Sequence, residues 1–286
     1  MGTTWTAGLA RWYAAHGRHD LPWRQTQDPW AVLVSEVMLQ QTQVTRVIPY
    51  WLDFTARWPD PASFAAAPRA DVLRAWQGLG YPRRAAALLD TAALVAAHGW
   101  PHDEAGLRSL PGIGRYTARA LLTLALGVPS APPLDVNISR VAARAGAGAE
   151  PNEVPVSALE QCIAGARPRS LDPRRYTFAL FDAGALYCRV TPACDGCPLQ
   201  RGCAWRRLGR APAAGSTRRP LVPYATSMRR LRGVLLAAAL RNDGDLTHEA
   251  ARTAAALVAA TLPPARDPAL IDQAVASLRA DRLIGG

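Results

Sequence analysis

The chain has 286 residues, and 33 basic residues against 22 acidic residues give it a formal net charge of +11. All 33 are arginine, so chemistry that needs a lysine amine, such as Schiff-base catalysis, is excluded. With 49% hydrophobic and 19% charged residues, the chain can bury a core, which excludes an intrinsically disordered protein. The positive charge predicts an acidic partner such as nucleic acid, although biased base usage alone would also enrich arginine.

Apolar residues recur at three- and four-residue spacing along most of the chain, which is typical of helices that bury one face. Pro, Gly and Asp residues separate these segments, and no alternating strand pattern of useful length precedes residue 230. We therefore predict an all-α protein made of many short helices. In chain order, helices are expected at residues 5–16, 30–39, 43–57, 71–78, 83–98, 117–126, 136–145, 156–165 and 175–187.

The last part of the chain follows a basic segment. Residues 201–233 contain nine arginines and no acidic residue. Within them, residues 209–227 are rich in Pro, Ala, Gly and Ser, so we interpret this stretch as a basic linker, with a solvated basic surface as the alternative. Residues 228–286 then predict a small domain that resembles a winged-helix unit with a truncated wing. Its helices are expected at Arg230–Arg241, Thr247–Thr261 and Pro268–Asp281.

A glycine-rich turn occurs in the segment from Leu110 to Ala118, where Gly112 and Gly114 bracket Ile113. It joins a helix that ends near Leu110 to one that begins near Tyr116. Glycines let backbone N–H groups approach an anion closely, and the following helix N-terminus adds positive potential. The pattern is that of a helix-hairpin-helix, which holds a DNA phosphate without reading sequence; a plain turn between two helices is the alternative.

Four cysteines lie within sixteen residues: Cys188, Cys194, Cys197 and Cys203. Such a density of thiols predicts a metal site, and ligation by thiolates alone suits zinc or an iron–sulfur cluster. A single Cys-x-x-Cys pair flanked by lone cysteines on longer loops resembles cluster ligation more than a zinc ribbon. The fifth cysteine, Cys162, lies on an apolar helix face and is expected in the core.

Two carboxylates have environments that predict different ionisation. Glu36 is the only ionisable residue in an apolar helix, so burial should raise its pKa and favour the protonated form. Asp135 follows a proline-rich stretch and precedes a helix, at an N-cap position that favours the anion. An acid and an anion of this kind suit cleavage of a glycosidic bond. Taken singly, Asp135 could be a plain cap, and Glu36 could pair with Arg24.

Several segments occur together in a characteristic order. They are Leu21-Pro-Trp-Arg24, residues 35–43, Gly78-Leu-Gly-Tyr81, the hairpin at 110–118, Leu134-Asp-Val-Asn137 and the four cysteines. Over about residues 5–208 the chain resembles the adenine DNA glycosylases of the MutY type, in the helix-hairpin-helix superfamily that includes endonuclease III. The resemblance implies removal of adenine mispaired with 8-oxoguanine or guanine in double-stranded DNA, with the adenine extruded from the duplex.

The resemblance also implies a domain plan. Residues 1–208 would form the catalytic core, with a six-helix module at 26–133. Residues 1–25 and 134–208 would form a second module around a 4Fe–4S cluster, and the active site would lie between the two. Residues 228–286 are too short for the Nudix-like reader domain of full-length members, so their role and the recognition of the opposite base are left open.

By position, the resemblance makes Glu36 the acid that protonates adenine N7 and then activates water. Asp135 would stabilise the cationic sugar, and Tyr116 and Asn137 would hydrogen-bond these carboxyl groups. Trp23, Arg24 and Leu39 would line the base pocket. The residues expected to contact DNA are Gln40, Gln41, Tyr81, Gly112, Ile113 and Gly114. Of these, Gln41 and Tyr81 would enter the DNA helix beside the opposite base. The cluster ligands would be Cys188, Cys194, Cys197 and Cys203.

One position separates two chemistries within the superfamily. Tyr116 stands where the endonuclease III branch has a lysine that cuts the DNA backbone, so we predict a monofunctional enzyme that leaves an abasic site. A thymine or uracil mismatch glycosylase is one alternative, against which residues 40–43 favour adenine. A second alternative is a non-catalytic iron–sulfur protein that binds DNA or senses redox state. The presence together of Glu36, Asp135, Tyr116 and Asn137 favours an enzyme over this alternative.

The N-terminus lacks a signal peptide pattern, and no apolar run approaches the about 18–20 residues that span a bilayer. We therefore expect a monomer in the cytoplasm, associated with nucleoid DNA and not with a membrane.

Overall fold

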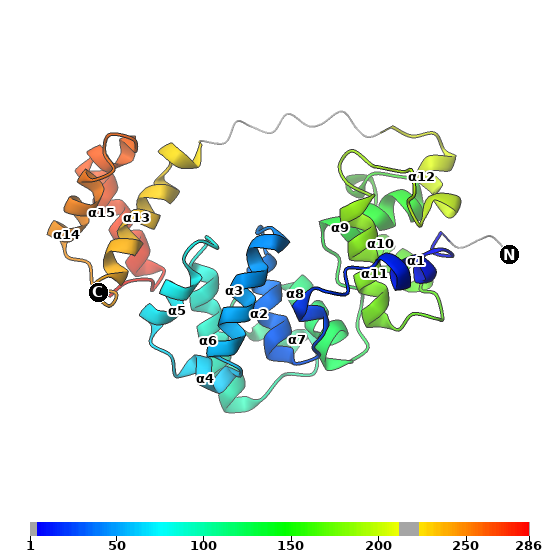
Figure 1. Cartoon of the computed structure of the whole chain (residues 1–286), viewed down its shortest axis with the longest axis horizontal. Coiled ribbons are helices and arrows are strands. Elements are labelled where there is room, and N and C mark those ends of the chain that lie inside the picture. Colours follow the sequence, from blue (N-terminus) through cyan, green and yellow to red (C-terminus); the bar gives the residue numbers. More distant parts are fainter. Residues whose placement is uncertain (1–4, 212–222, 286) are drawn as a thin grey trace. The chain divides into compact units, whose positions relative to one another are not determined.

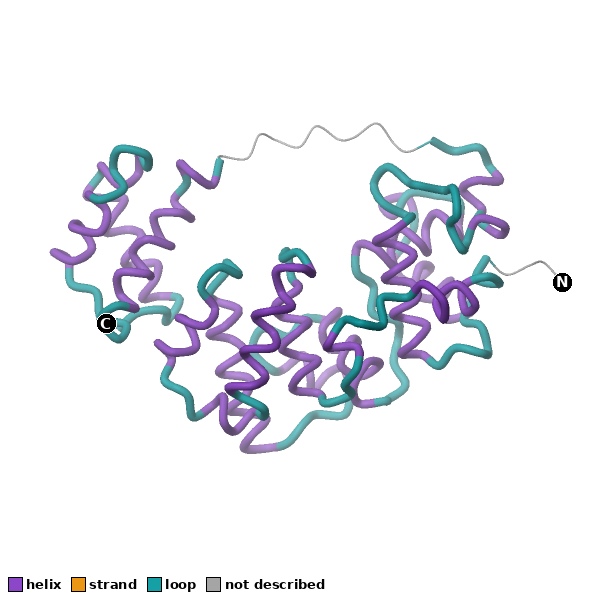
Figure 2. Tube along the Cα trace, in the orientation of Figure 1, coloured by secondary structure: helices purple, strands orange, loops and turns teal. Residues whose placement is uncertain are grey.

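The computed structural model describes residues 5–211 and 223–285 (Figure 1). Every regular element in these residues is a helix, as the tube in Figure 2 shows, so the prediction of an all-α protein is confirmed. The predicted linker lies partly outside the described residues, at 212–222. No helix of the described chain is long and apolar enough to cross a membrane.

The chain divides by its contacts into two compact units. The first comprises Met1–Gln40 and Trp100–Ser216, and the second comprises Gln41–Gly99 and Thr217–Gly286. Within these ranges the structure describes all residues apart from 1–4, 212–222 and 286. The expected partition into a six-helix module and a cluster module follows other boundaries and stays a prediction.

Helix α2 is the centre of the first unit. Asp28 caps its first turn by accepting hydrogen bonds from the backbone N–H groups of Trp30 (3.3 Å) and Ala31 (3.0 Å). Residues 30–38 are all buried, so the helix is covered on every side, in part by α8. The helices of this unit are α1 (Leu9–His16), α2 (Pro29–Leu39), α7 (Glu104–Ser109), α8 (Arg115–Leu121), α9 (Val136–Val141), α10 (Val156–Gly165), α11 (Pro173–Leu186) and α12 (Ala204–Arg207).

Helices α9 and α11 pack closely at one point. A methyl group added at Gly184 on α11 would lie 2.7 Å from Cβ of Asn137 and 2.9 Å from its backbone oxygen. Only a glycine lets the two helices approach this closely. The start of α9, which includes the candidate site residue Asn137, can therefore lie this close to α11 only because residue 184 has no side chain.

The second unit is built on an aromatic cluster. The ring of Phe54 lies 4.7 Å from Trp58, 5.4 Å from Phe64 and 5.7 Å from Trp76, measured between ring centroids. The helices of this unit are α3 (Val44–Arg57), α4 (Pro61–Ala65), α5 (Arg69–Trp76), α6 (Arg83–His98), α13 (Met228–Leu240), α14 (His248–Ala256) and α15 (Pro268–Ala280). The last three pack on one another and α13 also contacts α5.

The predicted helices agree with the observed ones within a few residues. The differences include α4 and α12, where no helix is expected, and the C-terminal domain. No helix is expected between residues 57 and 71, where prolines occur, yet α4 forms there. Asp60 and Ser63 make a capping box at its start, and Pro61 occupies the first helical position. In the C-terminal domain, α14 ends at Ala256 instead of Thr261, and a short 3-10 helix follows at Pro263–Arg266. Residues 223–285 contain three α-helices, two short 3-10 helices and no strand, so no wing is seen there.

Candidate active site

Glu36 and Tyr116 form the buried centre of the site. Glu36 projects from α2 and is only 7% exposed, and Tyr116 on α8 donates a hydrogen bond to its carboxylate. Burial raises the pKa of Glu36 to about 7; the hydrogen bond from Tyr116 opposes this rise, and the nearby charge of Asp135 adds to it. At neutral pH, Glu36 is therefore able both to give and to accept a proton, as the sequence predicts.

Asp135 caps helix α9. One carboxylate oxygen, Oδ1, accepts hydrogen bonds from the backbone N–H groups of Asn137 (2.9 Å) and Ile138 (2.7 Å), and Oδ2 accepts one from the Asn137 side chain (2.6 Å). These bonds favour the anion, but burial outweighs them, so the pKa of Asp135 is raised and not lowered as a simple cap would predict. The structure thus brings Glu36, Tyr116, Asp135 and Asn137 together in one unit.

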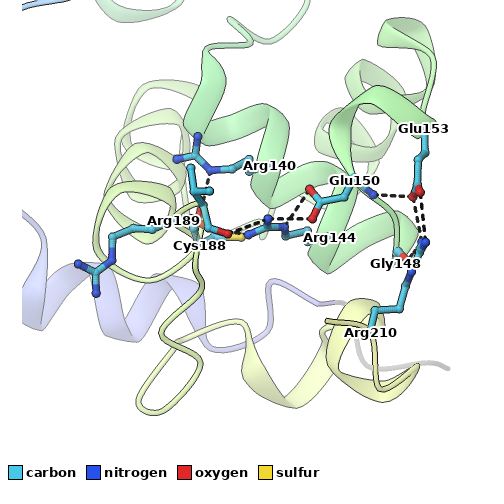
Figure 3. Close-up of polar contacts among 9 residues, drawn as sticks. Arg140, Arg144, Gly148, Glu150, Glu153, Cys188, Arg189 and Arg210 are labelled. Carbon is cyan, nitrogen blue, oxygen red and sulfur yellow. Dashed lines mark hydrogen bonds and ion pairs between the residues drawn. The ribbon is translucent and has the colours of Figure 1, made fainter. Parts of the chain in front are cut away.

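Arg140 connects this group to the cysteine-rich segment, and Figure 3 shows its contact with Cys188. Its Nη2 donates to Oδ1 of Asn137 (2.6 Å), and its Nε donates to the backbone oxygen of Cys188 (2.8 Å). The positive charge of Arg140 opposes the rise in the pKa of Asp135 that burial causes. One guanidinium therefore fixes the Asn137 amide and ties it to the first of the four cysteines.

The predicted base-pocket residue Arg24 is held by an acid that sequence reasoning missed. Its Nη1 and Nη2 donate to the two oxygens of Asp182 at 2.7 and 2.9 Å, and Arg18 binds the same carboxylate. Burial alone would raise the pKa of Asp182, but the hydrogen bonds and charges of Arg24 and Arg18 bring it below its ordinary value. Arg24 therefore pairs with Asp182 and not with Glu36. Asp182 lies in an apolar stretch of α11, the same signal that identified Glu36.

The other two predicted pocket residues, Trp23 and Leu39, belong to the same unit. Trp23 is buried beside Arg24 in the 3-10 turn Pro22–Arg24. Leu39 is the last residue of α2, three positions after Glu36, and is half-buried. All three predicted pocket residues thus belong to the first unit together with Glu36.

The predicted hairpin is present between α7 and α8. Gly112 has φ +75°, a conformation that favours glycine, and Gly114 is the N-cap of α8, while Ile113 is buried between them. Arg119 on α8 forms ion pairs with Glu104 on α7 (2.7 Å) and with Glu160 on α10 (2.6 Å). These ion pairs link the two helices of the hairpin to each other and to α10. Both glycines are exposed, as a phosphate-binding turn requires.

Gln41 and Tyr81 form a strained pair in the second unit. Both have positive φ, +58° and +49°, which is uncommon for residues other than glycine. The Tyr81 hydroxyl donates to Oε1 of Gln41 at 2.6 Å, and Tyr81 is 48% exposed. The structure therefore brings together two residues that the resemblance places beside the opposite base. Gln40, which is expected to contact DNA, is half-buried in the first unit.

The four cysteines fit an iron–sulfur cluster. Burial, together with the smaller effect of the nearby Cys188, Cys203 and Cys194, raises the pKa of Cys197 to about 11, so the four cysteines lie close together. In the described residues, however, no three His, Cys, Asp or Glu side chains are arranged to hold a single metal ion.

A second arginine holds the backbone of the same segment (Figure 3). Arg144 donates to the backbone oxygens of Arg189 (2.6 Å) and Val190 (3.1 Å), and it pairs with Glu150 (2.9 Å). Its side chain is only 4% exposed, so this ion pair is shielded from solvent. A buried side chain thus fixes the backbone directly after the first cysteine.

Comparisons with known proteins agree with this geometry. Residues 34–162 match the family described as HhH-GPD superfamily base excision DNA repair protein. The adenine DNA glycosylase of Mycolicibacterium smegmatis is 42% identical over 234 residues, which cover 80% of this chain and 78% of the relative. That of Mycobacterium tuberculosis is 40% identical over 282 residues, which cover 96% of this chain and 88% of the relative.

Solved structures share the fold. A thermostable thymine-DNA glycosylase superposes with a TM-score of 0.61 at 23% identity, over 71% of this chain and 95% of that one. A trapped endonuclease III–DNA covalent intermediate gives 0.59 at 21% identity, over 72% and 95%. Fold and site together define a helix-hairpin-helix protein of base excision DNA repair. Within that class, the chain belongs to the family of MutY-type adenine DNA glycosylases, as its motifs predict.

Proposed function

We propose that this protein is a monofunctional DNA glycosylase of base excision repair that hydrolyses the N-glycosidic bond of adenine mispaired with 8-oxoguanine or guanine. The observation that carries the proposal is the buried Glu36, whose pKa is about 7, hydrogen-bonded to Tyr116 and close to Asp135. The relatives named above are adenine DNA glycosylases, which supports adenine as the base.

In the proposed reaction, protonated Glu36 gives its proton to N7 of the extruded adenine. The C1′–N9 bond breaks, its electron pair leaves with the base, and positive charge develops on the sugar. Asp135 stabilises this charge as an anion, helped by the hydrogen bonds of Asn137 and Ile138. Glu36 then accepts a proton from the water that attacks C1′. Acid–base catalysis of this kind contributes about 10²–10⁴-fold.

The proposed reaction ends at an abasic site. Cleavage of the DNA backbone by the superfamily's lysine route needs an amine at the position of Tyr116, and the chain contains no lysine. The burial that raises the pKa of Tyr116 well above its ordinary value keeps this phenol protonated. It therefore serves as a hydrogen-bond donor to Glu36 and not as a nucleophile.

Double-stranded DNA is the proposed partner of a monomer acting on nucleoid DNA in the cytoplasm. The turn of Gly112, Ile113 and Gly114 would hold a backbone phosphate through its N–H groups. Gln41 and Tyr81 are proposed to lie beside the opposite base, and Gln40 is proposed to contact DNA. The residues proposed for the base pocket are Trp23, Arg24 and Leu39, with Asp182 fixing Arg24.

We propose that Cys188, Cys194, Cys197 and Cys203 hold a 4Fe–4S cluster. When bound, the cluster supplies a cross-link between the ends of the segment 188–203. Arg140 and Arg144 already hold the start of this segment against α9 and the turn after it.

The test is a single-turnover glycosylase assay on duplexes with adenine opposite 8-oxoguanine, adenine opposite guanine, thymine opposite guanine and uracil opposite guanine. Adenine release from the first two, abolished by Glu36→Gln and strongly reduced by Asp135→Asn, is expected. Release of thymine or uracil but never adenine would replace the substrate assignment. Equal activity in the parent and both variants would overturn the catalytic roles.

A further inference from the structure

The C-terminal domain, residues 223–285, is attached to both ends of the loop that carries Tyr81. We propose that this domain is a brace that positions the loop at residues 77–82 and thereby tunes which opposite base is accepted. This inference rests on the proposed function, because it gives a role to the loop in reading the opposite base. All contacts involved lie within the second unit.

The first attachment is Arg74, near the end of α5 and directly before the loop. Its Nε and Nη2 donate to the backbone oxygen of Leu240 at 3.0 and 2.7 Å, and Nη2 also pairs with Asp243 at 2.6 Å. Leu240 is the last residue of α13, where carbonyl groups lack partners within the helix. A guanidinium at this position satisfies such a carbonyl and interacts favourably with the negative end of the helix dipole.

The second attachment is Arg83, the first residue of α6 and directly after the loop. It pairs with Asp281 at 3.4 Å, at the end of α15, and Asp281 also binds Arg232 on α13 at 2.5 Å. Asp281 is only 15% exposed, whereas Arg83 is 72% exposed. This contact is thus the weaker of the two, but it holds the opposite end of the loop to the same domain.

Between these attachments the loop adopts a conformation that must be held. Gly78, Gly80 and Tyr81 all have positive φ, and a side chain at Tyr81 makes this conformation costly. Trp76 donates to the backbone oxygen of Gly80 (3.0 Å), and Arg84 lies 5.1 Å from the centre of the Tyr81 ring. A strained segment relaxes when its ends are released, so contacts at both ends affect the position of Tyr81.

The brace predicts a particular pattern of effects. The catalytic group of Glu36 and Asp135 belongs to the first unit and makes no use of these contacts. Loss of the brace should therefore change the preference for the base opposite adenine more than the chemical step. A domain that only stabilised the fold would lower activity on every duplex by the same factor.

The experiment uses the full chain with Arg74→Ala and Asp281→Asn. The matched control is Asp53→Asn, which breaks a pair with Arg57 on α3 (2.9 Å) that involves no residue of the C-terminal domain. Hydrogen–deuterium exchange at residues 77–81 is measured together with single-turnover excision of adenine opposite 8-oxoguanine and opposite guanine. Both brace variants should exchange faster in the loop, Arg74→Ala more than Asp281→Asn. The ratio of the two rates should fall by about three- to tenfold in Arg74→Ala.

Unchanged exchange in the loop of folded Arg74→Ala would overturn the brace. Faster exchange with an unchanged ratio of rates would overturn its role in reading the opposite base. If Arg74→Ala loses the fold of the C-terminal domain, Asp281→Asn gives the same two readouts with the domain intact. A parent that releases no adenine would instead defeat the proposed function, and the exchange measurement would still decide whether the brace exists.

Discussion

Arg140 donates a hydrogen bond to the side chain of Asn137 at 2.6 Å, one turn away on α9, and so fixes the amide that in turn binds Asp135. The same guanidinium reaches the backbone oxygen of Cys188. Replacing Arg140 by glutamine should lower the excision rate by about 10- to 100-fold, the usual effect of removing a group that orients another. The check is single-turnover kinetics at saturating enzyme, with Arg167→Gln, which lies outside this chain of contacts, as the control.

The raised pKa of Glu36 predicts how stability depends on pH. The folded protein keeps the Glu36 proton up to about pH 7, whereas the unfolded chain loses it near 4.5. Between these values the folded state binds more protons, so stability should fall as the pH rises. Glu36→Gln removes this effect and should be more stable than the parent at pH 8 by up to about 3 kcal/mol. Urea unfolding at pH 5 and pH 8 measures it, and a difference that does not grow with pH would contradict it.

The close approach of α9 and α11 predicts a strong effect of one methyl group. Gly184→Ala would force its Cβ against the backbone of Asn137, so α9 must shift. We expect a loss of about 1–3 kcal/mol in unfolding free energy, together with a slower reaction because Asp135 moves with the helix. Gly165→Ala is the matched control, since a Cβ there meets nothing within 4 Å.

The absence of lysine predicts the product of the reaction. Borohydride added during turnover should trap no adduct through a side chain, and the DNA strand should stay intact until alkali is added. Tyr116→Lys supplies the missing amine, so borohydride is expected to trap a covalent complex of this variant with DNA. The variant should also release the base more slowly, because the hydrogen bond from the Tyr116 hydroxyl to Glu36 is lost. Gel electrophoresis under denaturing conditions distinguishes these outcomes; efficient trapping by the parent would refute the prediction.

The proposed 4Fe–4S cluster at residues 188–203 predicts how much iron the purified protein contains. Protein isolated without oxygen should contain about four iron atoms per chain and absorb visible light. Cys197→Ser should lose most of this iron, whereas Cys162→Ser, which changes a thiol near Ala142 and away from the segment, should keep it. One zinc per chain and no iron would show that the ligands serve a different metal.

The sequence was sufficient for features that one segment encodes. Glu36 stands out as a lone acid in an apolar helix, and Asp135 as a cap after a proline-rich stretch, and both lie where these signals place them. Asp182 gives the same signal as Glu36 and was missed because no motif surrounded it. The contact of Arg140 with Cys188 spans 48 residues and ends on a backbone oxygen, which no side-chain pattern encodes.

The boundaries of α4 and α14 show a further limit. Prolines at the start of α4 look like a break, but Pro61 occupies the position in which proline begins a helix. The apolar spacing of α14 continues beyond Ala256, yet residues 257–261 form turns that lead to the 3-10 helix at Pro263. Local pattern predicts that an element exists, whereas tertiary packing determines where it ends.

The buried cations of this protein are all guanidinium groups, and arginine keeps its charge at every pH at which a protein is folded. Arg24, Arg119 and Arg144 are each almost wholly buried beside a carboxylate. As Glu36 gains and loses its proton near neutrality, the positive charges around it do not change. The pH response of the catalytic acid should therefore depend on carboxylates such as Asp135, whose charge raises the pKa of Glu36, and not on any change in the charge of these arginines.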